Sequence, residues 1–232
     1  MVGARSRSTM PPAAVPPELA AVILVGGRSQ RMGRPKVTLE LDGRPLLAHV
    51  LAAIRPLVRE VILVAAADQT IPLALAASRP DGACPVRIVH DRVVAAGPLP
   101  ALALGLAAVT TGLAIALPCD APFVRPALLT ELARRLAGAD APVLQGLIPT
   151  WGGHLQPLVA AYRPGVASDL EALVARGETR LQSVGQLRDV AILAEDDVRT
   201  VDPTGESFRV LNTPADLVAA ERELAARATR RS

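Results

Sequence analysis

At 232 residues the chain is long enough to bury a sizeable core in one domain. Half of its residues are hydrophobic but only 2% are aromatic, so the core must consist of Ala, Leu, Val and Ile, which suits a parallel sheet covered by helices. The formal net charge of +3 comes with arginines gathered near the two termini and with no basic, aromatic-rich stripe inside the expected fold, so we expect no nucleic-acid partner.

The termini and the cysteines bear on where the protein works. Residues 1–17 are rich in proline and lack the apolar stretch of a secretory signal, so we expect a disordered N-terminal tail followed by a single domain over residues 18–229. No apolar run is long and uninterrupted enough to span a membrane. Cys84 and Cys119 lack the spacing of a metal site or a disulfide framework, which favours a reduced, cytoplasmic setting.

From Ala20 onwards, segments with the pattern of strands alternate with segments with the helical pattern. The expected strands of the first part are 20–25, 39–41, 60–65, 86–89 and 113–117, and the expected helices are 44–58, 69–77, 99–109 and 126–136. After them we expect strands at 141–147, 155–162, 190–193 and 208–211, and helices at 166–175 and 214–228. This alternation predicts an α/β fold with a doubly wound, mostly parallel sheet.

The most informative segment follows the first expected strand. Gly26 and Gly27 end that strand, and a basic stretch that includes Arg31 and Lys36 comes next. Adjacent glycines let backbone N–H groups approach a ligand closely, and the cations can neutralise phosphate charge. Lys36 is followed by valine, which excludes a P-loop, and the next glycine is Gly33, which excludes the dinucleotide fingerprint. The pattern indicates a phosphate-binding loop of another kind; a basic surface loop is the alternative.

Two carboxylates come at the ends of later strands: Asp91 after the strand at 86–89, and Asp120 after the strand at 113–117. Strand ends on one edge of a parallel sheet meet at the same crevice, here the one that also holds the glycine pair. Mg²⁺ takes oxygen ligands and often uses one or two carboxylates together with phosphates and waters. We therefore predict that Asp120 is a magnesium ligand; the alternative is a cap of the helix that begins near Pro126. For Asp91, a surface turn is nearly as good an interpretation as a position in the binding site.

Five segments in this order resemble the molybdenum cofactor guanylyltransferase family: LVGGRSQRMGRPK, HD before GPL, LPCDAPFV, HLQPLVAAY and LNTPADL. The similarity covers roughly residues 21–217, and the first and third segments are the specific ones. It implies a Rossmann-like nucleotidyltransferase fold and transfer of GMP from GTP to the terminal phosphate of molybdopterin, with Mg²⁺ as cofactor and pyrophosphate as the leaving group. Acceptor molybdoenzymes or their chaperones are implied as further partners.

The resemblance also implies roles for single residues. Backbone groups of the first strand end and its loop would contact GTP, Lys36 would bind its phosphates, Asp91 would contact the nucleotide, and Asp120 would bind both GTP and Mg²⁺. Together with Asp120, Arg31 and Lys36 would carry the catalysis by offsetting the repulsion between two phosphate anions. The implied contacts along the first loop are Leu24, Val25, Gly26 and Gly27, and the acceptor side is assigned to Gln156 and Asn212. His154 lies near that side in the sequence, where a structural role is the more common one.

Two departures from the family pattern concern the base and one loop. The family usually has an asparagine that contacts guanine where this chain has Ala65–Ala67, and Ala-Gly where this chain has Pro100-Ala101. Gly27 and Asn212 favour the guanylyl branch over the cytidylyl branch, which usually has LAAG and aspartate at these places. The alternatives are therefore a cytidylyltransferase of the same cofactor, a sugar nucleotidyltransferase, and a nucleotide-binding regulator without catalysis.

Overall fold

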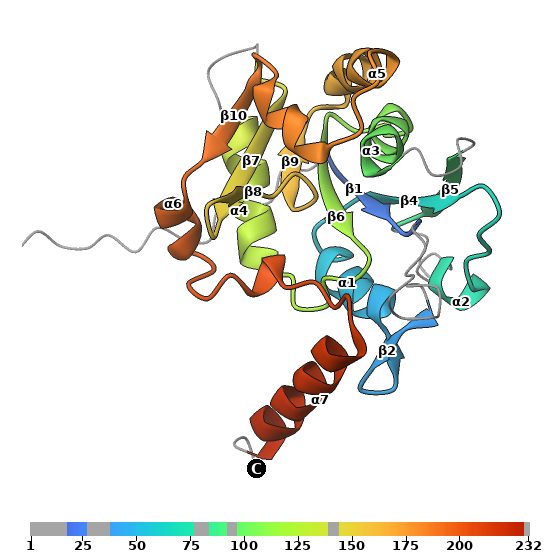
Figure 1. Cartoon of the computed structure of the whole chain (residues 1–232), viewed down its shortest axis with the longest axis vertical. Coiled ribbons are helices and arrows are strands. Elements are labelled where there is room, and N and C mark those ends of the chain that lie inside the picture. The colour runs from blue at the N-terminus through green and yellow to red at the C-terminus, as the bar shows by residue number, and fades with distance from the viewer. Residues whose placement is uncertain (1–17, 27–37, 77–83, 92–96, 139–143, 230–232) are drawn as a thin grey trace, which may run out of the picture.

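The computed structural model describes residues 18–26, 38–76, 84–91, 97–138 and 144–229. At its centre lies one mixed sheet with the strand order β10-β7-β9-β6-β1-β4-β5, and β8 pairs with β7 beside this path (Figure 1). Four neighbouring strands are mutually parallel and form the half of the sheet that positions the site. They are β6 (Leu113–Pro118), β1 (Leu19–Leu24), β4 (Glu60–Ala66) and β5 (Val86–Asp91).

The other half of the sheet contains the one reversed strand of this path among the described residues. β9 (Ala160–Tyr162) runs antiparallel to both β6 and β7 (Gly146–Trp151), and β10 (Val190–Leu193) is parallel to β7. β8 (His154–Leu155) returns along β7 as a short hairpin. The carboxyl ends of β7, β6, β1, β4 and β5 therefore share one edge of the sheet.

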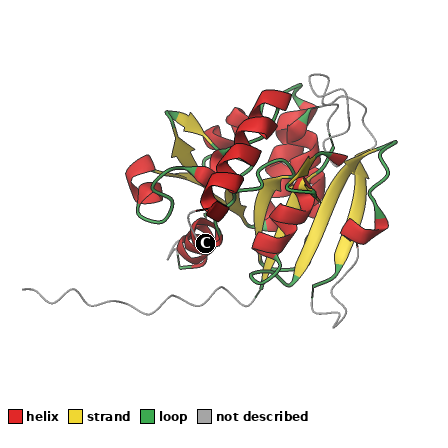
Figure 2. Cartoon of the chain, turned by 90° about the horizontal axis from the view of Figure 1, so that it is seen from below, coloured by secondary structure: helices red, strands yellow, loops and turns green. Residues whose placement is uncertain are grey.

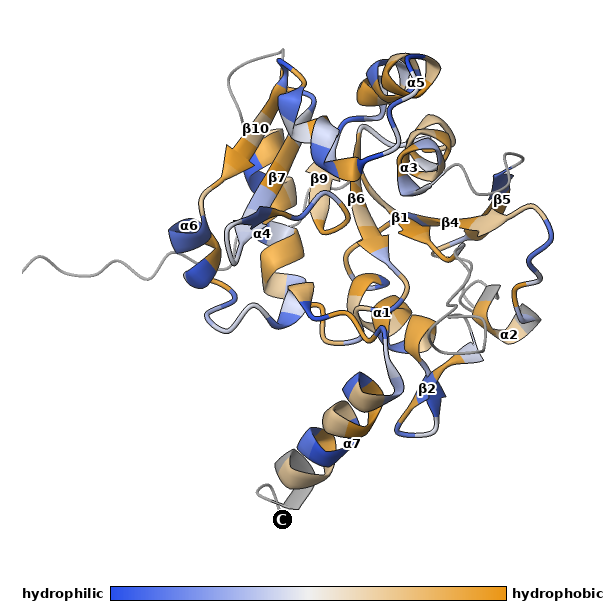
Figure 3. Ribbon diagram, viewed as in Figure 1, coloured by the Kyte–Doolittle hydropathy of each residue, from blue (hydrophilic) through white to orange (hydrophobic). Residues whose placement is uncertain are grey.

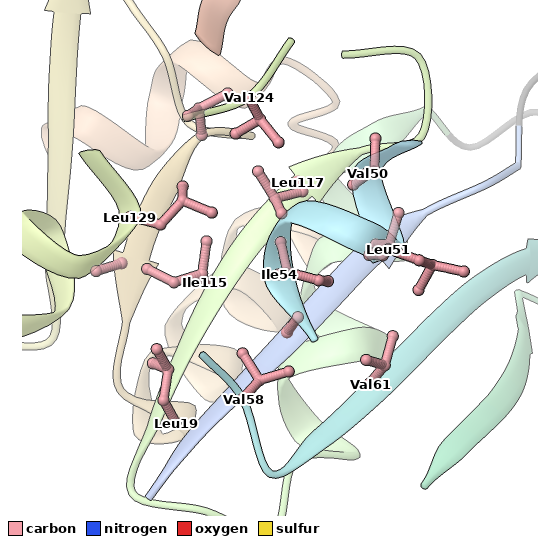
Figure 4. Packing of buried hydrophobic residues seen from close by; sticks show 14 of the residues in the cluster. Leu19, Val50, Leu51, Ile54, Val58, Val61, Ile115, Leu117, Val124 and Leu129 are labelled. Carbon is pink, nitrogen blue, oxygen red and sulfur yellow. The ribbon is translucent and has the colours of Figure 1, made fainter. Parts of the chain in front are cut away.

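Helices cover both faces of the sheet (Figure 2). Alternate residues of β1 point to opposite faces, and every residue of the strand is buried. One face packs on α1 (Leu46–Ile54) and α4 (Pro126–Ala137), where Ile54, Leu117 and Val61 belong to the same core (Figure 4). The other face packs on α3 (Pro98–Ala107) and α5 (Ala167–Ala175). Burial on both faces is why the strands read as continuous apolar runs.

The close approach of α3 to the sheet depends on a glycine. A Cβ atom at Gly105 would lie 2.4 Å from Val22 Cγ1 and 2.8 Å from Val64 Cγ2. Contacts this short do not occur between real carbon atoms, so any side chain here would push the helix away from β1 and β4. The helix thus lies directly on the two strands whose ends carry the site.

The remaining elements lie at the periphery. They are the hairpin of β2 (Glu40–Leu41) and β3 (Arg44–Pro45), α2 (Leu73–Ala76), α6 (Glu195–Arg199), α7 (Pro214–Thr229), and 3-10 turns at Pro164–Val166, Leu181–Gln186 and Glu206–Phe208. α7 extends away from the body (Figure 1), and the hydrophobic residues lie both in the strands and in the helices that cover them (Figure 3). A small third core joins Leu41 and Leu46 to Leu211 and Ala220 of the C-terminal part. No helix in the described ranges combines the length and apolarity that crossing a membrane requires.

The structure confirms the expected α/β, doubly wound, mostly parallel sheet. Its strands β1, β4, β5, β6 and β10 lie within one or two residues of the expected ranges. Asp91 closes β5 as its last residue instead of following it. The tail at 1–17 lies outside the described residues, and the single domain over 18–229 stays a prediction.

Three expected strands are wrong in place or kind. The strand expected at 141–147 begins only at Gly146, where pairing with β10 starts, and residues 141–143 lie outside the described part. The strand expected at 155–162 is interrupted between β8 and β9, because Pro157 has no N–H to donate to a ladder. Residues 208–211 form no strand; Phe208 instead stacks on Trp151, and Leu211 is buried in the third core.

Candidate active site

The ends of four parallel strands place the predicted site residues in one row. Leu24 lies in register between Val64 of β4 and Pro118 of β6, and Ala66 lies in register with Asp91 of β5. Along the edge the order is thus Asp120 after β6, the Val25-Gly26 segment after β1, the end of β4, and Asp91 on β5. This is the edge where open α/β sheets bind their ligands.

At the end of β1 the side chains are buried, and the backbone amides are bonded to β4. The side chains of Leu24 and Val25 are buried in opposite cores. The Val25 and Gly26 amides both donate to the Val64 carbonyl, at 2.9 and 3.1 Å. A Cβ atom at Gly26 would lie 3.1 Å from the Ala66 nitrogen, so a side chain would crowd the backbone of β4. The glycine therefore keeps the chain close to β4 as it enters the loop.

Asp120 lies between the end of β1 and the C-terminal part of the chain. The amide of Cys119 donates to the Leu24 carbonyl at 3.2 Å, and the amide of Leu211 donates to the Asp120 carbonyl at 2.9 Å. Asp120 is 3% exposed, which is unusual for a carboxylate in a turn after a strand. The turn is fixed from both sides, so the place of this carboxylate is set by segments from both ends of the sequence.

The two predicted carboxylates do not share a cation. Asp120 follows β6 and Asp91 ends β5, and β1 and β4 lie between them; three strand spacings amount to about 14 Å. Among the described residues no group of three His, Cys, Asp or Glu side chains could hold a metal ion. A lone carboxylate at Asp120 nevertheless fits Mg²⁺, which keeps several waters and takes its other ligands from the phosphates of a nucleotide.

The residues assigned to the acceptor side lie on the same edge. Gln156 follows β8, and its backbone N–H donates to the Pro149 carbonyl at 2.9 Å. Its side-chain nitrogen lies 3.4 Å from the carbonyls of Trp151 and His154. The hydroxyl of Tyr162, the fully buried last residue of β9, donates to the Pro157 carbonyl at 2.8 Å. Burial raises the pKa of this phenol well above its usual value, so it remains a donor. His154 is exposed, and its structural role stays a prediction.

Asn212 comes close to Asp120 because Leu211 is bonded to it. The Asp216 carboxylate accepts the amides of Asn212 at 3.0 Å and Thr213 at 2.8 Å, while Thr213 Oγ1 accepts the Asp216 amide at 3.2 Å. This is a reciprocal cap for the start of α7. The Thr213 hydroxyl, followed by the two amides, lowers the pKa of Asp216 below its usual value.

A network of charged side chains around one buried carboxylate holds the segment that leads to Leu211. Asp202, fully buried, accepts the amides of Glu206 at 3.1 Å and Ser207 at 2.9 Å. Arg125, at the start of α4, lies 3.4 Å from Asp202 and 2.7 Å from Glu206, and its amide donates to Ser207 Oγ at 3.0 Å. The segment 202–208 is thereby fixed to the chain that follows Asp120.

The hairpin that precedes Gln156 has its own support from α6. The amide of Gly152 donates to Glu195 at 2.8 Å, and the Arg199 guanidinium lies 4.5 Å from the centre of the Trp151 ring. Trp151 and Phe208 stack with their ring centres 5.6 Å apart. The tryptophan thus packs the hairpin against the same C-terminal segment that contacts Asp120.

The structure therefore brings together Gly26, Asp120 and Asn212, places Gln156 and Asp91 on the same edge, and leaves their roles as predictions. Gly27, Arg31 and Lys36 lie outside the described residues. Sequence reasoning missed three supporting residues: Tyr162, Asp202 and Gln69, whose side chain bonds the Ala66 amide and the Val25 carbonyl. Their signal was weak, because each is a single polar residue whose partners are read only from the folded chain.

Comparison with known proteins agrees with this geometry. Residues 21–194 match the MobA-like NTP transferase domain. The chain is 34% identical over 186 residues to a "Probable molybdenum cofactor guanylyltransferase" of Mycobacterium tuberculosis H37Rv, which covers 78% of this chain and 86% of that protein. It is 35% identical over 205 residues to a protein of the same description from Chloroflexus aggregans, covering 86% and 91%.

Solved structures share the fold. Molybdopterin-guanine dinucleotide biosynthesis protein A of Archaeoglobus fulgidus superimposes with a TM-score of 0.73 at 25% identity, covering 89% of this chain and 99% of that one. The 4-diphosphocytidyl-2C-methyl-D-erythritol synthase of Anaerococcus prevotii superimposes with a TM-score of 0.64 at 15% identity, covering 90% and 98%. At that identity the second likeness concerns the fold alone.

Proposed function

Because the chain belongs to the family of MobA-like NTP transferases, we propose that it transfers GMP from GTP to the terminal phosphate of molybdopterin and releases pyrophosphate. The relatives described as molybdenum cofactor guanylyltransferases support this choice of substrates. The observation that carries the proposal is the convergence at one sheet edge of the Gly26 backbone, the buried Asp120 carboxylate and, through the Leu211–Asp120 bond, Asn212.

The proposed reaction needs little acid–base chemistry from the protein. A phosphate monoester has a second pKa of about 6, so the acceptor is largely a dianion near neutral pH and needs no general base. The barrier lies in bringing two anions together at the α-phosphorus. In this proposal Asp120 holds Mg²⁺, which when bound would reduce that repulsion and stabilise the pyrophosphate leaving group. Arg31 and Lys36 would add positive charge on the phosphates.

The residues of the edge divide between the two substrates. The Leu24–Gly26 backbone and Asp91 lie on the side of β1, β4 and β5, and we assign the nucleotide to that side. Gln156 and Asn212 lie on the side of β7, β9 and β6, and we assign the pterin to it. In this proposal the transferred GMP group would pass Asp120, which lies between these groups.

The decisive experiment measures pyrophosphate release by the purified protein with Mg²⁺, molybdopterin and one nucleoside triphosphate at a time. Release with GTP, and much less with CTP or ATP, supports the proposal. Preference for CTP would replace it with the cytidylyltransferase alternative. GTP binding without pyrophosphate release, under conditions where a known family member turns over, would indicate the regulator without catalysis.

A further inference from the structure

The ladder between β1 and β4 ends in an unusual way. The Val25 amide donates to the Val64 carbonyl at 2.9 Å. In a parallel ladder the next bond would run from the Ala66 amide to the Val25 carbonyl. Instead, the Ala66 amide donates to Gln69 Oε1 at 3.2 Å, and Gln69 Nε2 donates to the Val25 carbonyl at 2.9 Å. The side-chain amide of Gln69 is inserted between the strands in the place of one ladder bond.

The inserted amide has one orientation that satisfies both partners. A primary amide offers N–H donors on one side and an acceptor oxygen on the other. The Val25 carbonyl needs a donor and the Ala66 amide needs an acceptor, so a flipped Gln69 would lose both bonds. The backbone N–H of Gln69 also donates to the Ala66 carbonyl, at 3.0 Å. This bond holds the turn that brings the Gln69 side chain back to the strands.

The insertion fixes the peptide group that leads into the glycine loop. The peptide between Val25 and Gly26 donates its N–H to the Val64 carbonyl at 3.1 Å, and its carbonyl accepts from Gln69. Both polar groups of this peptide are therefore engaged, the N–H by β4 and the carbonyl by Gln69, so the peptide plane cannot rotate without breaking a bond. A carbonyl held in this way cannot turn toward an anion bound at the loop, where it would repel phosphate.

We propose that Gln69 is a positioning residue of the nucleotide subsite, which sets the Val25-Gly26 peptide by standing in for one bond of the β1–β4 ladder. This inference rests on the proposed function, because the loop it positions is the one assigned to the nucleoside triphosphate. Gln69 thus supplies a side-chain amide near the end of β4, where Ala65–Ala67 supply none. Gln69 does not touch the reacting atoms and acts through the backbone of β1.

The effect on nucleotide binding is separable from the effect on folding. When the side-chain amide of Gln69 is removed, the Ala66 N–H can donate directly to the Val25 carbonyl. One hydrogen bond between the strands then replaces the two that Gln69 made. The free energy of unfolding then changes little, whereas the Val25-Gly26 peptide shifts toward β4. Since the shift affects ground state and transition state alike, the Michaelis constant for GTP should rise and kcat should stay nearly constant.

The test compares Gln69→Met with Gln145→Met in the full chain. Methionine keeps the length of the side chain and removes its hydrogen bonds, and Gln145 lies at the opposite edge of the sheet, before β7. Gln69→Met should raise both the dissociation constant and the Michaelis constant for GTP about three- to tenfold, the range for the loss of one hydrogen bond. Gln145→Met should change neither constant, and both variants should unfold within a few degrees of the wild type.

A second variant provides a readout that a purely structural role would not move. In Gln69→Glu the carboxylate can accept from Ala66 but cannot donate to Val25, whereas the protonated acid can do both. The ratio of its GTP dissociation constant to that of the wild type should therefore fall as the pH is lowered from about 8 to about 5, toward the usual glutamate pKa of about 4.3.

The outcomes separate this inference from the function on which it rests. If the wild type binds GTP and Gln69→Met binds it equally well, the positioning role is wrong and the proposed function stands. An equal loss in Gln145→Met, or a pH-independent ratio for Gln69→Glu, also overturns it. A wild type that binds no nucleoside triphosphate overturns the function and, with it, this inference.

Discussion

At the scale of single residues, Asp120 combines burial with a position on the ligand-binding edge. Its turn is bonded to β1 through Cys119 and to the C-terminal segment through Leu211. A buried carboxylate in a turn fixed on both sides is held in one place before any cation arrives, which is what a metal ligand requires.

We predict that Asp120→Asn lowers kcat for pyrophosphate release about 10²- to 10³-fold, because the amide keeps the shape of the side chain but loses the charge that would hold Mg²⁺. Thermal unfolding followed by circular dichroism should stay close to that of the wild type. Asp169→Asn, on the exposed side of α5, is the matched control and should leave kcat unchanged. Near wild-type turnover of Asp120→Asn with Mg²⁺ would remove Asp120 from the metal site.

The base preference depends on which alanine at the end of β4 can reach a ligand. Ala65 is 1% exposed and belongs to the core under α1, whereas Ala66 is partly exposed and lies beside Gly26. We therefore expect Ala66→Asn to widen the GTP-over-ATP ratio in kcat/KM, since a hydrogen-bonding site discriminates far better than an apolar one. Ala65→Asn should lower stability instead, because it buries an amide in the core.

Competition assays with mixed nucleotides give the ratio for Ala66→Asn, and urea unfolding gives the stability of Ala65→Asn. If Ala66→Asn leaves the ratio unchanged, this position does not face the base. If Ala65→Asn instead widens the ratio at wild-type stability, the roles of the two alanines are reversed.

At the scale of elements, the segment 202–208 acts as a brace between α4 and the turn that carries Asp120. Its centre is Asp202, a buried carboxylate that satisfies two backbone amides and pairs with Arg125. Removing its carboxylate leaves the Glu206 and Ser207 amides without their acceptor, whereas Arg125 keeps its ion pair with Glu206.

We predict that Asp202→Ala lowers the free energy of unfolding by about 3 kcal/mol, because two backbone amides lose their acceptor and each unsatisfied buried donor costs about 1–3 kcal/mol. Because the brace leads to Leu211 and Asp120, kcat should fall as well. Urea unfolding and pyrophosphate release measure the two effects. Asp196→Ala, on the first turn of α6, is a matched control and should change the free energy of unfolding little. A wild-type unfolding curve for Asp202→Ala would show that the brace is dispensable.

The start of α7 is a second element with a defined local support. Thr213→Ala removes the hydroxyl that accepts the Asp216 amide and should cost about 1 kcal/mol, the usual value for an N-cap. The pKa of Asp216 is lowered in the folded chain. Its contribution is therefore present at neutral pH and is lost as the pH falls below the usual aspartate range toward the lowered value.

Urea unfolding of wild type and Thr213→Ala at several pH values tests this cap. The difference between them should shrink on acidification, because the Thr213 hydroxyl is the largest cause of the lowered pKa. A difference that is constant down to acid pH would show that the Thr213 hydroxyl and the Asp216 charge act independently.

At the scale of the whole molecule, the sequence predicts the sheet far better than the supports of its site. Apolar runs such as 19–24 and 113–117 mark strands because both faces of a parallel sheet are buried. Gly26 and Asp120 could be placed at one edge because they follow such strands. The contact of Gln69 with Val25 spans 44 residues and that of Arg125 with Ser207 spans 82, so no local sequence pattern predicts them.

In the C-terminal part, a local sequence pattern predicts a strand that the structure does not contain. The apolar residues at 208–211 resemble a strand, but Phe208 and Leu211 pack separately, one on Trp151 and one in the third core. Periodicity records which residues are buried and not which surface buries them. To predict how residues 208–211 pack, one must know where α7 and the hairpin β2–β3 lie, and these elements come from distant parts of the chain.

This arrangement makes the site depend on both ends of the folded chain. Leu211 is fully buried with Leu41 and Leu46, and its amide is bonded to Asp120. A chain that ends after Val210 loses this bond, exposes the third core and loses Asn212. We therefore predict that it melts at a lower temperature and releases pyrophosphate at least tenfold more slowly, since removal of one buried leucine side chain alone costs about 2–5 kcal/mol.

The matched control ends after Ala225, which keeps Leu211, Ala220 and Leu224 and so keeps the contacts of α7 with the body. It should melt and turn over like the full chain. Measuring kcat/KM well below the melting temperature of the shorter chain separates loss of the site from unfolding. If the chain that ends after Val210 keeps wild-type kcat/KM under those conditions, neither the Leu211–Asp120 bond nor Asn212 contributes to the reaction, and the acceptor side must be sought around Gln156 alone.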